Sequence, residues 1–175
     1  MNKFLRLLRH DLPLHIVLFA TNFLPDNVPF LALRGLLAGL FLGSCKGRFR
    51  VGRNVVFYNP ACIHLGENVY IAYGCVLLAV AEIYLEDEVM LGPYVVLSAG
   101  NHLRMAGSYR FGSQERLQIC IGAGSWVGAH TTILPGAQIG QGCLVASNTA
   151  VTRGEYPPNT LIAGVPARVR KTLTN

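Results

Sequence analysis

The residues best suited to chemistry lie in one stretch, 98–118, which carries His102 near its start and Arg104, Arg110 and Arg116 along it. An imidazole can act as a general base near neutral pH, and guanidinium groups bind phosphate or carboxylate oxygens. From its position alone, His102 is either such a base or an ordinary loop histidine. The remaining histidines favour structural, interfacial, solvent-facing or turn positions: His10, His15, His64 and His130.

This stretch interrupts a repeat with a period of six residues. After it, an aliphatic residue recurs at every sixth position, and four residues after each of the first five lies a small one. The aliphatic residues are Ile121, Val127, Ile133, Ile139, Val145 and Val151, and the small ones are Ser125, Thr131, Ala137, Cys143 and Thr149. A period of six fits neither an α-helix nor a single strand. It is typical of a parallel β-helix, in which each coil is a triangle of three short strands.

The same period appears upstream, first weakly and then with a slip of two residues. The three upstream sets are Val51, Phe57, Ile63; Leu65, Ile71, Leu77; and Leu85, Leu91, Leu97. We therefore predict an all-β domain over residues 47–156, with residues 98–118 inserted as a protruding loop. The ends of such a coil must be covered. We expect residues 1–46 to cover one end as an apolar helical segment, and residues 157–175 to close the other with a short helix.

Composition narrows the class of protein. The net charge of +6 favours anionic partners such as phosphates, nucleotides or acidic lipid. Basic residues are not interleaved with aromatic ones on one face, so we do not expect nucleic-acid binding. The five cysteines are odd in number and form no CxxC pair, which indicates a reducing compartment without a disulfide framework. Cys75 and Cys143 fall on small-residue positions of the repeat and are expected to be packing residues.

Residues 1–46 are strongly apolar but broken by prolines. One run of about 11 residues lies between Pro13 and Pro25, and a second of about 14 contains Arg34. A spanning helix needs roughly 20 apolar residues, so a straight span is not expected. We predict two short helices lying in one leaflet, with residues 1–50 in peripheral contact with acidic headgroups on the inner face of the cytoplasmic membrane. The alternative is that the helices pack on the β-helix or across a subunit interface. A secretory signal is not favoured, because no convincing cleavage site follows.

Three segments in this order resemble the hexapeptide-repeat acetyltransferases: "GPYVVLSAGNH", "IGAGSWVGAHTTILPGAQIGQGCLVASNTAV" and "PPNTLIAGVPARV". The likeness covers about residues 50–172 and is strongest to galactoside and maltose O-acetyltransferases and their relatives in surface-polysaccharide synthesis. The N-terminal apolar segment does not look like the galactoside enzymes. The resemblance implies a homotrimer of left-handed parallel β-helices, an active site between adjacent subunits, acetyl-CoA as donor, a sugar hydroxyl as acceptor and no metal.

The resemblance also implies roles for individual residues. His102 falls on the catalytic histidine of the family, in "NH" where the family has "GH", and would take the proton of the attacking hydroxyl. The cofactor positions would be Trp126 beside the donor and acceptor channel, Ala129, Ser147 and Thr152 along the pantetheine arm, and Arg168 and Lys171 near the adenine and 3′-phosphate. The six-residue spacing itself predicts that the Trp126 side chain points outward. Alternatively, Trp126 is a subunit contact, and the two basic residues are the solvated face of a C-terminal helix.

One departure concerns the acceptor. The galactoside enzymes hold their sugar with an Asn and paired Asp residues, at positions where this sequence has Ala72, Ala79 and Val80. Apolar side chains cannot bind sugar hydroxyls, so that recognition is not expected here. Candidate acceptor residues are Tyr73, Asn101, Arg104, Arg110 and Arg116. Because arginines clamp phosphates, we expect a sugar or lipid-linked saccharide as acceptor.

Other functions remain open. The same base could serve N-acetylation of an amino sugar, and the β-helix could be a non-catalytic scaffold. A metalloenzyme like the γ-carbonic anhydrases is disfavoured, because its histidine ligands include a close pair and here His102 and His130 lie 28 residues apart.

Overall fold

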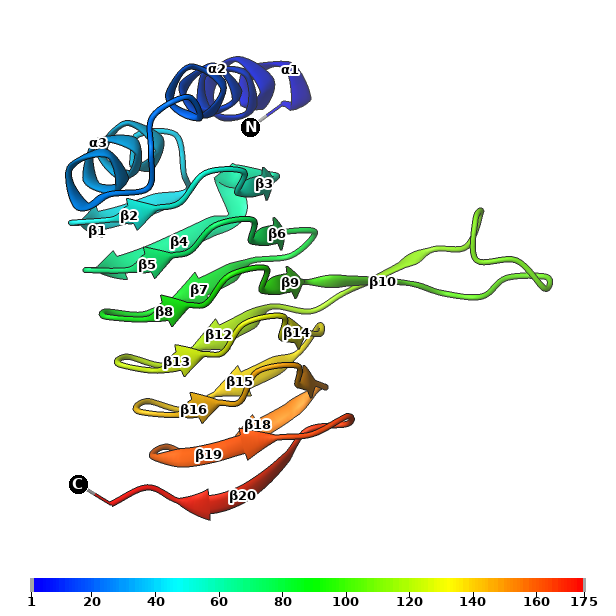
Figure 1. The fold of residues 1–175 in the computed structure, drawn as a ribbon. Coiled ribbons are helices and arrows are strands. Elements are labelled where there is room, and N and C mark those ends of the chain that lie inside the picture. The colour runs from blue at the N-terminus through cyan, green and yellow to red at the C-terminus, as the bar shows by residue number, and fades with distance from the viewer. Residues whose placement is uncertain (1, 175) are drawn as a thin grey trace.

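The in-phase aliphatic residues form the interior of a three-sided parallel coil in the computed structural model, which describes residues 2–174 (Figure 1). Val127, for example, is fully buried and lies in register with Leu91 on one side and Val145 on the other. The small residues of the repeat are also buried: Ser125, Thr131, Ala137, Cys143 and Thr149. The predicted β-helix and its phase are confirmed, and only Phe57 of the upstream sets is partly exposed.

Each side of the triangle is a sheet of stacked strands. Face 1 contains β1 (Ser44–Gly47), β4 (Ile63–Glu67), β7 (Ile83–Leu85), β12 (Ile119–Ile121), β15 (Ala137–Ile139) and β18 (Gly154–Tyr156). Face 2 contains β2 (Arg50–Val51), β5 (Tyr70–Ile71), β8 (Met90–Leu91), β13 (Trp126–Val127), β16 (Leu144–Val145), β19 (Thr160–Ala163) and β20 (Arg168–Thr172). Face 3 contains β3 (Val56–Tyr58), β6 (Val76–Leu78), β9 (Val96–Ser98), β14 (Thr132–Ile133) and β17 (Ala150–Val151). A 3-10 turn, η2 (Pro60–Cys62), precedes β4.

The interruption of the repeat is a two-stranded arm that projects away from the coil (Figure 1). It leaves the corner between faces 3 and 1 after β9 and consists of β10 (Gly100–His102) and β11 (Gln114–Arg116), paired antiparallel. His102 lies opposite Gln114 in this pairing. The coil resumes at β12, in register with β7.

Helices cover the N-terminal end of the coil (Figure 1). They are α1 (Lys3–Arg6), the π-helical turn η1 (Leu7–Asp11), α2 (Leu12–Thr21) and α3 (Val28–Gly39). The side chains of Asn2 and Asn27 cap α1 and α3 by accepting backbone N–H groups. Leu14 and Ala38 join the core of the coil, so these helices do pack on the β-helix. Within residues 2–174, no helix combines the length and apolarity that crossing a bilayer would require.

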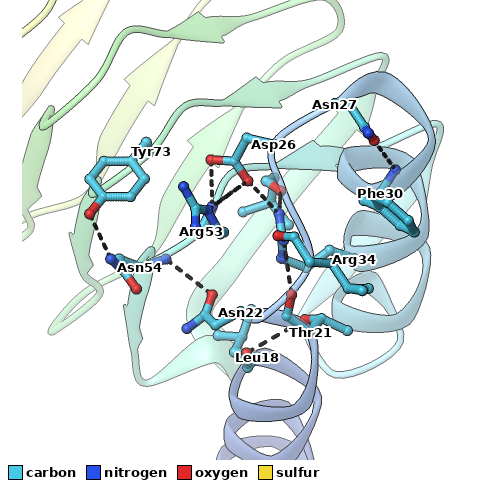
Figure 2. A network of polar contacts seen from close by, with 12 residues as sticks. Leu18, Thr21, Asn22, Asp26, Asn27, Phe30, Arg34, Arg53, Asn54 and Tyr73 are labelled. Atoms are coloured by element: carbon cyan, nitrogen blue, oxygen red, sulfur yellow. Dashed lines mark hydrogen bonds and ion pairs between the residues drawn. The ribbon is translucent and has the colours of Figure 1, made fainter.

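A buried arginine ties this cap to the first coil (Figure 2). The Arg34 side chain is completely buried, and its guanidinium donates to the carbonyl oxygens of Val51 at 2.8 Å and of Thr21 and Leu24 at 3.0 Å. Asp26 lies 3.0 Å from the same guanidinium. Three carbonyls and a carboxylate therefore compensate the buried charge, as burial of a cation requires. The sequence indicated only that Arg34 interrupts an apolar run.

The prediction of a short C-terminal helix is wrong. Among residues 157–174 the chain forms β19 and β20, which pair antiparallel with Ala163 opposite Arg168. The physical reason is that β19 ends the face 2 sheet and would leave a row of unpaired backbone groups at its edge. A returning strand satisfies those groups, whereas a helix cannot.

Candidate active site

His102 stands on the exposed surface of the arm, near the coil. Its neighbours hold the backbone in place: Leu103 donates its N–H to the Ser113 carbonyl at 2.9 Å, and the Asn101 amide donates to the Glu115 carboxylate at 3.3 Å. The His102 ring makes no hydrogen bond with any residue in the range 2–174. Both ring nitrogens are therefore free for a ligand or a second copy of the chain.

The arm arginines are exposed, in keeping with a surface that binds an anion. The Arg110 guanidinium lies 5.6 Å from the centre of the Phe111 ring, and Arg116 approaches the side chain of Gln114 at 3.5 Å. Arg104, Arg110 and Arg116 form no ion pair within the described part of the chain. Three cations without a carboxylate partner thus share the arm with the histidine.

The corner between faces 2 and 3 carries two of the expected pantetheine positions. The N–H of Asn148 donates to the Ala129 carbonyl at 3.0 Å, so Ala129 and Ser147 lie on successive coils of the same corner. A Cβ atom on Gly128 would lie 2.6 Å from the Ser147 nitrogen, which shows how closely the two coils approach. Backbone groups and small side chains line this corner, which suits close packing of a narrow ligand arm.

Aromatic residues continue the same corner toward the N-terminal end. The rings of Tyr94 and His130 stack with centres 5.0 Å apart, and Tyr73 meets Tyr94 edge to face at 5.4 Å. The Arg53 guanidinium lies 5.8 Å from the Tyr73 ring centre, and the Asn54 amide donates to the Tyr73 hydroxyl at 2.7 Å (Figure 2). Tyr73 therefore shares a corner with Ala129 and Ser147. A residue that binds the acceptor sugar next to the coenzyme A site would have such a position.

Sequence reasoning missed Arg53, Asn54, Tyr94 and His130 as members of this stack. Tyr73 and Tyr94 are 21 residues apart, and Tyr94 and His130 are 36 apart because the arm intervenes. Tyr94 and His130 both adopt positive φ, 59° and 57°, at equivalent turns. Because the arm makes the separation of these two turns differ from that of the other coils, the spacing of residues did not align them.

Trp126 and the C-terminal basic residues lie on face 2. Trp126 is 49% exposed and points outward as predicted. Successive strands place Trp126 beside Leu144, Leu144 beside Leu161, and Leu161 beside Lys171. Trp126 and Lys171 are thus three strands apart, about 14 Å. Arg168 lies on the same β20 strand and is exposed. These residues flank the corner that holds Ala129 and Ser147.

Thr152 and His102 lie on the opposite side of face 3. Thr152 directly follows β17, at the corner where β9 leads into the arm. Ser147 and Thr152 bound one side of the triangle, and five extended residues span about 16 Å. A single chain therefore does not bring His102 together with Ala129, Ser147 and Trp126. Thr152 is likewise separated from the other expected pantetheine residues.

Of the three positions where the resemblance places galactoside-binding residues, Ala72 and Ala79 are buried and Val80 is partly exposed. Ala72 and Ala79 are 3% and 0% exposed, and a Cβ atom on Gly100 would touch Val80 at 2.8 Å. These three residues pack the coil and the root of the arm.

In the described chain, no three His, Cys, Asp or Glu side chains are grouped to hold a metal ion.

Sequence comparison links this geometry to a family. Residues 121–153 match the model of the bacterial transferase hexapeptide (six repeats). A protein of Schizosaccharomyces pombe named as an acetyltransferase is 34% identical over 140 residues, which cover 80% of this chain and 67% of the relative.

Two solved structures extend the likeness to nearly the whole chain. The maltose O-acetyltransferase of Clostridium difficile 630 is 28% identical with a TM-score of 0.83, covering 98% of this chain and 89% of that one. A galactoside acetyltransferase in complex with coenzyme A is 27% identical with a TM-score of 0.78, covering 99% and 84%. This coverage includes the N-terminal helices, so the expectation that the galactoside enzymes do not match them is wrong at the level of the fold. The chain belongs to the hexapeptide-repeat acetyltransferases, with the left-handed parallel β-helix of that family.

Proposed function

We propose that the protein transfers an acetyl group from acetyl-CoA to a hydroxyl group of a sugar, with His102 as the general base. The observation that carries this proposal is an exposed imidazole, without a hydrogen-bond partner in the described chain, on the arm that interrupts the coil. Coenzyme A in a related structure supports the donor, and the sugars in the names of both related enzymes support the acceptor class.

The chemistry follows from what an imidazole can do. A sugar hydroxyl is too weakly acidic to attack a thioester well, so a base must take its proton as the oxygen bonds to the carbonyl carbon. The C–S bond then breaks, and the sulfur of coenzyme A receives a proton. A positioned base contributes roughly 10²–10⁴-fold to such a rate. Ala129 and Ser147 would hold the pantetheine arm, Trp126 would lie beside the donor and acceptor channel, and Arg168 and Lys171 would bind the phosphates.

We further propose that the working site is shared by two chains of a homotrimer. The support is the breadth of face 3, about 16 Å, which separates His102 from Ser147 within one chain. The arm of one chain would bring His102 to the face 2–face 3 corner of its neighbour. Asn101, Arg104, Arg110 and Arg116 would then line the acceptor side from one chain, and Tyr73 from the other.

Substitution of His102 tests the base. His102→Ala is expected to lower kcat at least about 10²-fold in a thiol-release assay, while binding of coenzyme A and the circular dichroism spectrum stay unchanged. His64→Ala, which removes a face 1 histidine 2.6 Å from Glu82, serves as the control and should keep wild-type turnover. Near-normal turnover by His102→Ala would exclude the proposed base.

Mixed assemblies test the shared site. His102→Ala and Ser147→Trp chains should each be inactive alone, the second because the larger side chain blocks the pantetheine corner. After co-refolding in equal amounts, about one quarter of the interfaces in random trimers would combine an intact His102 with an intact Ser147. Recovery of about 25% of wild-type activity is expected. No recovery above the single variants would show that each chain forms its own site.

A membrane-linked saccharide in surface-polysaccharide synthesis is the acceptor that fits best. The arm arginines suit a phosphate or pyrophosphate linkage, and the N-terminal cap carries an exposed apolar side suited to peripheral contact with the cytoplasmic membrane. Turnover with polyprenyl-linked sugars should exceed turnover with the free sugars. Preference for an amino sugar, with an amide as product, would instead identify an N-acetyltransferase.

A further inference from the structure

The outer side of the N-terminal cap is apolar, and the proposed chemistry uses none of it. Among residues 2–174, 24 large apolar side chains are exposed, and twelve of them lie between Phe4 and Leu40. Less than a quarter of the chain therefore carries half of these exposed apolar side chains. Such a concentration of exposed apolar side chains in one part of a protein indicates an interaction site.

On the first helical stretch, the exposed apolar side chains recur in steps of three or four residues: Leu8, Leu12, Ile16, Phe19 and Phe23. Residues at these steps share one side of a helix. Leu14 and Thr21 are buried on the opposite side, against the coil. The helix thus has one apolar side toward the protein and another toward solvent. The rings of Phe19 and Phe23 pack edge to face at its end, 6.0 Å apart.

The α3 helix repeats this arrangement and adds cations. Leu33, Leu36 and Leu40 are exposed, whereas Arg34 and Ala38 face the coil. Two grooves run beside α3. The larger, of about 470 Å³, has a lining that includes Val28, Leu31, Arg48, Arg50 and Glu88. The smaller, of about 160 Å³, is lined by Ala32, Leu36, Arg48, Phe49 and Arg50.

Arg48 and Arg50 are the residues that both grooves share. Both are exposed, and neither forms an ion pair within residues 2–174. Each groove therefore sets a guanidinium next to an apolar helix surface. This is the chemistry of a phospholipid, in which a phosphate adjoins hydrocarbon.

The charge of the protein is concentrated in the same part of the chain. Residues 1–53 contain eight of the 15 Lys and Arg residues but only two of the nine Asp and Glu residues. The remaining residues carry seven of each, so the net charge of +6 belongs to the first 53. A second copy of the cap would bring like charge to this surface, whereas an anionic bilayer is complementary to it.

We propose that the cap, residues 3–40 with Arg48 and Arg50, docks on the surface of an anionic phospholipid bilayer. The exposed leucine and phenylalanine side chains enter the boundary between headgroups and acyl chains, and the two arginines bind lipid phosphates. Because the cap lies at one end of the stack (Figure 1), the coil and its arm stay outside the bilayer. Docking itself does not depend on the proposed function. It would bring the enzyme to the surface on which a lipid-linked acceptor is displayed.

Co-sedimentation with vesicles tests this docking. The full-length protein should bind vesicles of phosphatidylcholine and phosphatidylglycerol, bind pure phosphatidylcholine much more weakly, and lose affinity as salt rises. Phe19→Glu/Phe23→Glu should lower the partition coefficient at least about 10²-fold. Two rings that the bilayer would bury are replaced by carboxylates that the anionic headgroups repel. Arg48→Gln/Arg50→Gln should lower it roughly 30-fold.

Matched controls place the same changes elsewhere. Phe111→Glu on the arm and Arg153→Gln/Arg170→Gln on the coil should leave vesicle binding unchanged. Circular dichroism and the oligomeric state are measured for every variant. Wild-type-like vesicle binding by Phe19→Glu/Phe23→Glu would overturn the proposal. A wild-type protein that does not bind anionic vesicles would overturn it as well. If the wild-type protein does not bind vesicles and Phe19→Glu/Phe23→Glu disrupts its oligomer, the cap is a subunit contact.

The two proposals fail separately. The vesicles contain neither acetyl-CoA nor saccharide, so binding is measured without catalysis. Protein that binds vesicles but releases no thiol with any acceptor would refute the proposed function alone. Protein that acetylates soluble sugars but never binds vesicles would refute docking alone.

Discussion

Replacing Arg34 by methionine removes the charged link between the cap and the coil while keeping most of the apolar stem. In the native protein the guanidinium is completely buried and donates to three carbonyl oxygens and to Asp26, at 2.8–3.0 Å. Hydrogen bonds to a charged group each contribute about 1.5–3 kcal/mol, but they are not additive. Because the substitution also removes the cost of burying a charge, we expect a net loss of about 3–5 kcal/mol in the stability of the cap.

Native-state hydrogen exchange measures this loss where it occurs. A coil of this type is stabilised locally, so the cap can open without unfolding the distant coils. The amides of α3 should exchange at least about 10²-fold faster in Arg34→Met, whereas those of β14 and β15 should be unaffected.

Arg53→Met is the matched control, since that side chain is 41% exposed and lies 3.6 Å from the same carboxylate. Such a pair contributes about 0–1 kcal/mol. Exchange of α3 in Arg34→Met within about fivefold of wild type would contradict the stabilising role assigned to the buried guanidinium.

Three further predictions concern packing, titration and cofactor binding. Gly35→Ala should destabilise the cap by about 3 kcal/mol in urea denaturation, because the new Cβ would lie 1.9 Å from the Phe49 oxygen. Gly39→Ala should destabilise it much less, because there the nearest atom is the Cys45 sulfur, at 3.2 Å. Burial raises the pKa of the Cys75 thiol from 9.0 to about 11. The contribution of this thiol to the free energy of unfolding should therefore stay level below pH 9 and fall by up to about 2–3 kcal/mol between pH 9 and 11, because only the unfolded chain ionises there. Cys75→Ala should remove this fall. Arg168→Gln/Lys171→Gln should raise KM for acetyl-CoA about tenfold, with a smaller effect for the analogue that lacks the 3′-phosphate.

Local repetition made much of the fold predictable. Each side of the triangle repeats within six residues, so the buried phase from Ile121 to Val151 and the outward direction of Trp126 follow from spacing alone. The arm was also recognisable, because it is the longest interruption of the six-residue spacing. The motif around His102 indicated the family for the same reason: its residues are close in sequence.

The tertiary structure decided what depends on how many residues fill each coil and on which edges remain unpaired. The stack of Tyr73, Tyr94 and His130 joins residues whose separations are unequal, because the arm intervenes between two of them. The C-terminal segment became a strand because β19 offered an open edge.

Arg34 is a further case, since its sequence neighbours indicate only an interrupted apolar run. Its partners come from the end of α2, from the turn before α3 and from β2, and they meet only when the helices fold over the coil. The sequence thus determined how the chain coils, because each turn of the coil depends on a repeat of only six residues. Only the tertiary structure decided which corners and edges meet, because that depends on packing between residues far apart in the chain.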